Sequence, residues 1–190
     1  MKFSENDRIF FTSDCHFGHR NISGKKLSKW SSGYRDFNSI EEMDETLLHN
    51  INKSVEYNDV LFILGDFAFN RPDYYRNRIN CQNVYCTPGN HDKVDREFNN
   101  LFTYTSPYME IIVGKQLFCL SHYSHRVWNK SHRGSIMLYG HSHNTLEDYG
   151  KSMDVGMDTC NHGHKKYHPY TLEEILVIME NKPIVNADRH

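Results

Sequence analysis

The stretch Val60–Asp66, VLFILGD, decides the fold, because it is an unbroken apolar run that stops at Gly-Asp. A short apolar run bounded by a turn signal predicts a strand that is buried in a sheet. Two other segments repeat the arrangement, Arg8–Ser13 (RIFFTS) ahead of Asp14 and Asn83–Thr87 (NVYCT) ahead of Pro88. The three segments therefore predict three buried strands.

Helical patterns lie between these strands. Ser39 and Glu42 form a capping box, and apolar residues follow at helical spacing as far as Ile51. A shorter helix is predicted from Pro72 through Ile79. The alternating order of strands and helices is typical of an α/β sheet with parallel neighbours.

The second half of the chain has a different character. Four strands are predicted there, namely Met109–Val113, Gln116–Ser121, Ser135–Tyr139 and Ser152–Gly156. Gly114 and Lys115 predict a hairpin between the first two of them. A second capping box, Thr171 with Glu174, opens a last helix. We therefore expect one domain over residues 1–190 in the α/β class, with two packed mixed β-sheets flanked by helices.

The composition restricts the class of protein. With 22 Lys and Arg against 24 Asp and Glu, the net charge of −2 argues against a strongly basic nucleic-acid coat. The five cysteines contain no C-x-x-C pair, and Cys15 is expected to be a neutral packing residue. The N-terminus is too polar for a signal peptide, and no apolar run approaches the roughly 20 residues of a membrane span. We expect a soluble cytoplasmic protein without membrane association.

Histidine is the unusual component, with 13 residues in 190. The side chains that could do chemistry come directly after predicted strands: Asp14, His16, Asp66, Asn90, His91, Asp92, His122, His141 and His143. Because ligands bind beyond the carboxyl ends of strands in α/β sheets, these residues are expected to meet at one rim. Carboxylate, imidazole and amide ligands together suit a pair of transition-metal ions. A Ser-His-Asp hydrolase or a structural zinc site fits less well, because the sequence has neither a G-x-S-x-G motif nor closely spaced cysteines.

Five motifs in chain order carry a resemblance to a known family: D-x-H at 14–16, G-D at 65–66, G-N-H-D at 89–92, S-H at 121–122 and G-H-x-H at 140–143. The pattern resembles that of the calcineurin-like metallophosphoesterases. The opening SDCHFGHRNI and the later MDVGMD resemble the small stand-alone members of bacteria and phages. The resemblance implies a four-layer α/β/β/α sandwich and a metal-dependent phosphodiesterase or phosphatase, located in the host cytoplasm if a phage encodes it.

The resemblance also implies the metal ligands and their metals. One cation would take Asp14, His16, Asp66 and His143, and a second would take Asp66, Asn90, His122 and His141. Asp66 would bridge two divalent or mixed-valence ions, with manganese as the first expectation and iron, zinc or nickel as alternatives.

Roles for the remaining motif residues follow from the same resemblance. A water shared by the two cations would attack phosphorus. His91 would protonate the leaving oxygen or stabilise developing charge, and Asp92 would orient and charge His91. The alternative for Asp92 is a helix cap for the segment that starts near Val94.

Two stretches without acidic residues, from Arg20 to Arg35 and from Ile111 to Leu146, flank the ligand loops. They could draw an anionic substrate to the site or form ordinary solvated loops. We expect His19, Arg20 and Arg126 to contact a small phosphorylated, nucleotide-like substrate. Two other functions stay open, a nuclease that acts on single-stranded or damaged nucleic acid and a non-catalytic, metal-stabilised interaction module. The net charge disfavours the nuclease.

Overall fold

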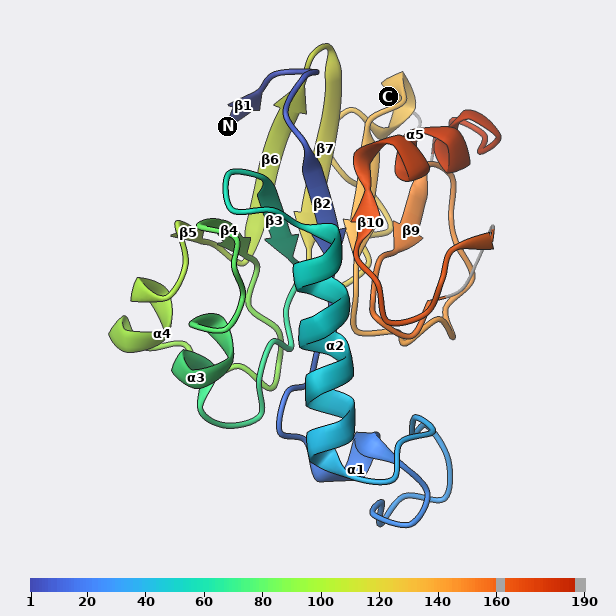
Figure 1. Cartoon of the computed structure of the whole chain (residues 1–190). Helices are drawn as coiled ribbons and strands as arrows, with labels where there is room; N and C mark the ends of the chain where they lie inside the picture. Colours follow the sequence, from blue (N-terminus) through green and yellow to red (C-terminus); the bar gives the residue numbers. More distant parts are fainter. Residues whose placement is uncertain (160–162, 187–190) are drawn as a thin grey trace.

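The computed structural model of the chain describes residues 1–159 and 163–186. Two mixed sheets of five strands each pack face to face, and helices flank them (Figure 1). The predicted α/β sandwich of two mixed sheets flanked by helices is therefore confirmed. Among the described residues, no helix is long and apolar enough to cross a membrane.

The first sheet contains the three strands that the apolar runs predicted. β2 (Ile9–Thr12), β3 (Val60–Ile63) and β4 (Asn83–Cys86) lie parallel in its centre. β5 (Tyr104–Thr105) extends it in parallel beyond β4, and β10 (Tyr170–Thr171) pairs antiparallel with β2 at the other edge. The sequence analysis missed both edge strands, because two residues are too few to show a period.

The second sheet has the order β1-β6-β7-β8-β9. β6 (Tyr108–Val113) and β7 (Gln116–Ser121) form the predicted antiparallel hairpin. β8 (Ile136–Tyr139) and β9 (Ser152–Asp154) extend this sheet in parallel beyond β7. Both strands lie where the sequence predicted them. β1 (Lys2–Phe3) adds a short edge parallel to β6, and it was not predicted.

The core between the sheets is built by alternation of side chains along the strands. Phe11 of β2 stacks on Phe62 of β3 with ring centroids 5.2 Å apart and reaches Phe118 of β7 at 5.9 Å. Phe10 and Leu61 point to the opposite face, toward the helices. The register of the sheets therefore also fixes which residues reach the ends of the strands.

The helices are α1 (Arg20–Ser23), α2 (Ile40–Ser54), α3 (Pro72–Arg76), α4 (Arg96–Asn100) and α5 (Leu172–Glu180). α2, α3 and α4 pack their apolar residues on the outer face of the first sheet. α5 begins with the complete capping box of Thr171 and Glu174 and packs into the core between the sheets. The outer face of the second sheet is covered by the segment around buried Trp128, which includes a single 3-10 turn at Ser131–Arg133.

Candidate metal centre

Two groups of metal-ligating side chains lie beyond the carboxyl ends of the strands. The groups are Asp14, His16 and His143, and Asp66, His122 and His141, with one ligand atom of each residue within 4.8 Å of the others in its group. Asn90 joins the second group, since its Oδ1 lies 3.1 Å from His122 Nε2. The structure thus brings together the seven residues expected as ligands.

Asp66 lies between the two groups. Its Oδ2 is 3.5 Å from His16 Nε2 of the first group and 3.6 Å from His122 Nε2 of the second. Its Oδ1 accepts the backbone N–H of His91 at 2.9 Å. One carboxylate oxygen therefore faces histidines of both groups while the other is held by the backbone.

Two buried ligand atoms of the first group have no hydrogen-bond partner in the described structure, Asp14 Oδ1 and His16 Nε2. They are 3.7 Å apart, and His143 Nε2 lies 3.8 Å from the same Asp14 oxygen. A buried polar atom without a partner is costly, and a cation among these three atoms would remove the cost. The residues of the first group therefore fit a metal ion.

His122 shows the same fit in the second group. Its Nδ1 lies 2.8 Å from the carbonyl oxygen of Leu64, which can only accept, so Nδ1 carries the proton. Nε2 then presents a lone pair toward the oxygens of Asn90 and Asp66. Three acceptor atoms therefore converge here, and the hydroxyl of Tyr123 donates to one of them, Asn90 Oδ1, at 3.4 Å. A cation among the three atoms would complete their coordination.

The electrostatics favour ligand-ready protonation states at His16, His141 and Asp14. At His143, burial would lower the pKa, but the hydrogen bond to Asp158 and the charge of Asp14 outweigh it and the pKa is raised. Burial lowers the pKa of His16 despite the neighbouring Asp14, and burial is also the main cause that lowers the pKa of His141. Burial would raise the pKa of Asp14, but His16 and His143 outweigh it and the pKa is lowered. Neutral imidazoles beside an ionised carboxylate are the forms that bind a metal ion.

The ligand loops are locally strained. Positive φ values occur at five of the seven ligands: Asp14 (56°), His16 (51°), Asp66 (50°), His141 (66°) and His143 (46°). This left-handed region is uncommon for residues other than glycine and persists only where the surrounding structure enforces it. The chain therefore turns sharply after β2, β3 and β8 and brings these five side chains into the two ligand groups.

Two glycines of the motifs allow close approach of the loops. Gly65 has a φ of +93°, and a Cβ there would lie 2.5 Å from His122 Nδ1. A Cβ on Gly89 would lie 2.2 Å from Asp66 Oδ1. The G-D and G-N-H-D motifs thus require glycine because any side chain would occupy the space of a ligand.

His91 and Asp92 have different surroundings. The ring of His91 is exposed at the rim, 5.4 Å from the His16 ring centroid. The carboxylate of Asp92 accepts the backbone N–H groups of Phe67 at 3.0 Å and Gly89 at 2.9 Å. Within the described part of the chain it makes no hydrogen bond to His91, so Asp92 ties two ligand loops together instead of holding the imidazole.

The alternative for Asp92, a helix cap near Val94, is wrong. Asp95 caps α4, because its Oδ1 accepts the backbone N–H of Phe98 at 2.8 Å.

Of the three expected substrate residues, only His19 lies at the site. Its Nδ1 is 3.4 Å from His16 Nδ1, and burial lowers its pKa to about 4. Arg20 donates to the carbonyl oxygen of Leu27 at 3.3 Å, and Arg126 stacks on Tyr149 at 3.7 Å. In the described residues, neither arginine has a contact with a ligand of either group.

The structure adds residues that the sequence analysis missed as site residues. Phe69, 50% exposed, stacks on His19 with centroids 4.4 Å apart, a role that its sequence position does not signal. Asp158 hydrogen-bonds His143 and pairs with Arg35. Asp158 follows β9, so the strand-end pattern that predicted the ligands could have found it.

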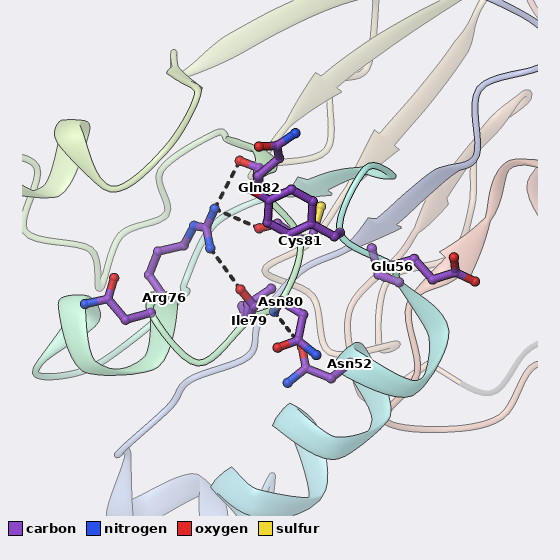
Figure 2. Close-up of a pocket in the computed structure, with 10 residues that line it drawn as sticks. Asn52, Glu56, Arg76, Ile79, Asn80, Cys81 and Gln82 are labelled. Atoms are coloured by element: carbon purple, nitrogen blue, oxygen red, sulfur yellow. Dashed lines mark hydrogen bonds between the residues drawn. The ribbon is translucent and has the colours of Figure 1, made fainter.

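A cavity of about 820 Å³ lies at the opposite edge of the first sheet, near the start of β3 and β4 (Figure 2). Arg76 is its prominent cation, but the guanidinium donates to the backbone carbonyls of Ile79 (3.3 Å), Cys81 (3.0 Å) and Gln82 (3.2 Å). Its hydrogen bonds therefore hold a loop. The candidate metal ligands lie beyond the opposite, carboxyl ends of the strands, where we place the site.

The fold is a sandwich of two mixed sheets, and two groups of side chains that could hold metal ions lie at one edge. The family model for calcineurin-like phosphoesterases matches residues 7–186. The chain belongs to this family, and it is a metal-dependent phosphoesterase that acts on a phosphorylated substrate. The predicted family and activity class are thereby confirmed.

Two similar proteins span nearly the whole chain. An uncharacterized protein of Methanocaldococcus jannaschii is 28% identical over 192 residues, which cover 95% of this chain and 96% of that protein. The crystal structure of a protein of unknown function from Aquifex aeolicus superposes with a TM-score of 0.66 at 20% identity, covering 91% of this chain and 100% of that one. The second likeness supports the fold.

Proposed function

We propose that this protein hydrolyses a small, nucleotide-like phosphoester at a dinuclear metal centre. The observation that carries the proposal is the position of Asp66, whose Oδ2 lies 3.5 Å from His16 Nε2 and 3.6 Å from His122 Nε2. A carboxylate placed between two sets of ligands suits a bridge between two cations.

The ligands divide as the motifs suggested. The first ion would be held by Asp14, His16, Asp66 and His143, and the second by Asp66, Asn90, His122 and His141. Such a pair supplies an activated water and stabilises the charge that develops at phosphorus. Manganese is the first candidate for both sites, with iron, zinc and nickel as alternatives.

His91 is the candidate proton donor to the leaving oxygen. Its backbone is anchored by the 2.9 Å hydrogen bond to Asp66, while its exposed ring lies 5.4 Å from the His16 ring and 5.6 Å from the His19 ring. A general acid must stand at the rim of the ligand set without being a ligand, and His91 meets this condition.

An aromatic rim, formed by Trp30, Phe69 and Tyr123, supports a nucleotide-like substrate. Phe69 and Trp30 contact His19 on one side of the site, with ring centroids 4.4 and 5.4 Å away. Tyr123 lies 4.6 Å from His141 on the other side. All three are between 44% and 50% exposed, so part of each ring is open to solvent beside the candidate ligands. Exposed aromatic faces bind the bases of nucleotides by stacking.

The test combines metal analysis with a substrate panel. Protein loaded with Mn²⁺ is expected to contain two ions per chain and to hydrolyse bis-p-nitrophenyl phosphate. Asp66→Asn should lose about 100-fold or more of this activity, because the bridge loses its charge. Asp73→Asn, an exposed carboxylate on α3, is the matched control and should behave as wild type.

The panel then separates the substrate classes. Cyclic, mono- and dinucleotides are expected to be better substrates than single-stranded DNA or RNA, whose preferential digestion would indicate a nuclease. A single ion per chain, or full activity of Asp66→Asn, would contradict the dinuclear mechanism.

A further inference from the structure

Arg35 is a buried arginine that reaches the metal centre from the side of the protein core. It is 3% exposed, and its guanidinium donates to the backbone carbonyl of Asp14 at 2.6 Å and to that of Cys15 at 3.0 Å. The same group donates two hydrogen bonds to the carboxylate of Asp158, from Nε to Oδ1 at 2.8 Å and from Nη2 to Oδ2 at 2.9 Å. A planar, two-pronged contact of this kind fixes the direction of a carboxylate.

Asp158 in turn orients the imidazole ring of His143. Its Oδ2 accepts a hydrogen bond from His143 Nδ1 at 2.7 Å. In the neutral imidazole this hydrogen bond places the proton on Nδ1, so Nε2 keeps its lone pair and faces Asp14 Oδ1 at 3.8 Å. A carboxylate on the far nitrogen of a ligating imidazole sets both its tautomer and its ring plane.

The charges of Arg35 and Asp158 suit each other in this buried place. The side chain of Arg35 is 2% exposed and that of Asp158 is 14% exposed, and the two form an ion pair at 2.8 Å. Each charge thus compensates the other, and neither is left alone in the core. Asp158 stays an acceptor toward His143.

We propose that Arg35 and Asp158 are positioning residues, which hold the carboxylate of Asp14 and the imidazole of His143 in place as ligands of the first metal ion. The two ligands come from different sheets, Asp14 after β2 and His143 after β8. One guanidinium ties both loops, directly to the backbone of Asp14 and through Asp158 to His143. The inference rests on the proposed metal centre.

Manganese binding to metal-free protein, measured by calorimetric titration, tests the inference without any turnover assay. Wild-type protein is expected to bind two ions. Asp158→Asn should weaken the binding of one ion by about 10- to 100-fold and leave the other unchanged, because only the first group contains His143. Arg35→Lys, which keeps the charge but loses the planar fork, should weaken the same ion. Asp148→Asn is the matched control, since Asp148 pairs with Lys182 and Tyr139 without a contact to any ligand.

Two further measurements separate a positioning role from a general loss of structure. Nitrogen NMR of the metal-free protein, recorded at a pH at which the imidazole of His143 is neutral, should show its proton at Nδ1 in wild type and a tautomer mixture in Asp158→Asn. The double variant Arg35→Met with Asp158→Leu leaves no buried charge unpaired and is expected to fold. It should show the same selective loss of one ion.

The outcomes distinguish a failure of the positioning role from a failure of the proposed dinuclear metal centre. If wild-type protein binds fewer than two manganese ions, the proposed dinuclear centre fails. If wild type binds two ions and Asp158→Asn binds both equally tightly, the positioning role of Asp158 and Arg35 is overturned. Equal weakening of both ions in every variant, the Asp148→Asn control included, would also overturn it.

Discussion

The backbone N–H of His91 donates a hydrogen bond of 2.9 Å to Oδ1 of Asp66. This contact joins the loop after β4 to the loop after β3 and leaves the second oxygen of Asp66 for the histidines. It also places the exposed ring of His91 beside the site although the ring is not a ligand. The proposed acid and the proposed bridge are therefore held at a fixed separation by the backbone.

His91→Gln should lower kcat by about 10²- to 10⁴-fold with little change in metal content, because the side chain donates a proton but binds no ion. The loss should be larger for a phosphoester with an alkyl alcohol as leaving group than for a p-nitrophenyl ester, whose leaving group needs no proton. Steady-state kinetics on both substrates measure this difference. His49→Gln, an exposed histidine on α2, is the control. Equal losses on both substrates would argue against proton donation.

Asp92→Asn should destabilise the protein by about 1–3 kcal/mol, because an amide can replace only one of the two acceptors that hold Phe67 and Gly89. Urea unfolding of the metal-free protein measures the change. Asp95→Asn is a control with almost no expected effect, since asparagine caps a helix as well as aspartate does. A large loss of kcat at unchanged stability would instead indicate that Asp92 orients His91.

Phe69→Leu and Trp30→Leu should each raise the KM for a nucleotide substrate by about 5- to 100-fold, because one stacking contact is lost. The KM for a phosphoester without a ring should stay within about twofold. Tyr104→Leu removes an equally exposed aromatic residue (50%) from an edge strand and should change neither value. Equal effects on both kinds of substrate would remove the stacking role.

The cysteine thiols of the described residues should react slowly with iodoacetamide in the folded protein. Cys15, Cys81, Cys86 and Cys119 are free and buried, and burial raises the pKa of each thiol. A raised pKa leaves little thiolate at pH 8, so the labelling rate should keep climbing as the pH rises above 9. Mass spectrometry of peptides from native and urea-unfolded protein checks this. Rapid native labelling of Cys15 would contradict the packing role expected for it.

Much of the fold could be predicted because its signals are local. An apolar run such as Val60–Leu64 is too continuous to lie at a surface, and the capping box of Thr171 and Glu174 marks a helix start within four residues. The edge strands β1, β5 and β10 escaped prediction, because they exist only through pairing with a distant neighbour.

The sequence by itself determined the family, the three central strands of the first sheet and the candidate ligands, because each motif follows a strand and strand ends meet at one edge. Only the tertiary structure decided which partners those ligands have. Arg35 and Asp158 are 123 residues apart, yet they form one ion pair behind His143. Phe67 and Phe69 share one short segment, yet the first is buried and the second is exposed over His19. Burial and long-range pairing depend on how both sheets pack, and no local pattern encodes that.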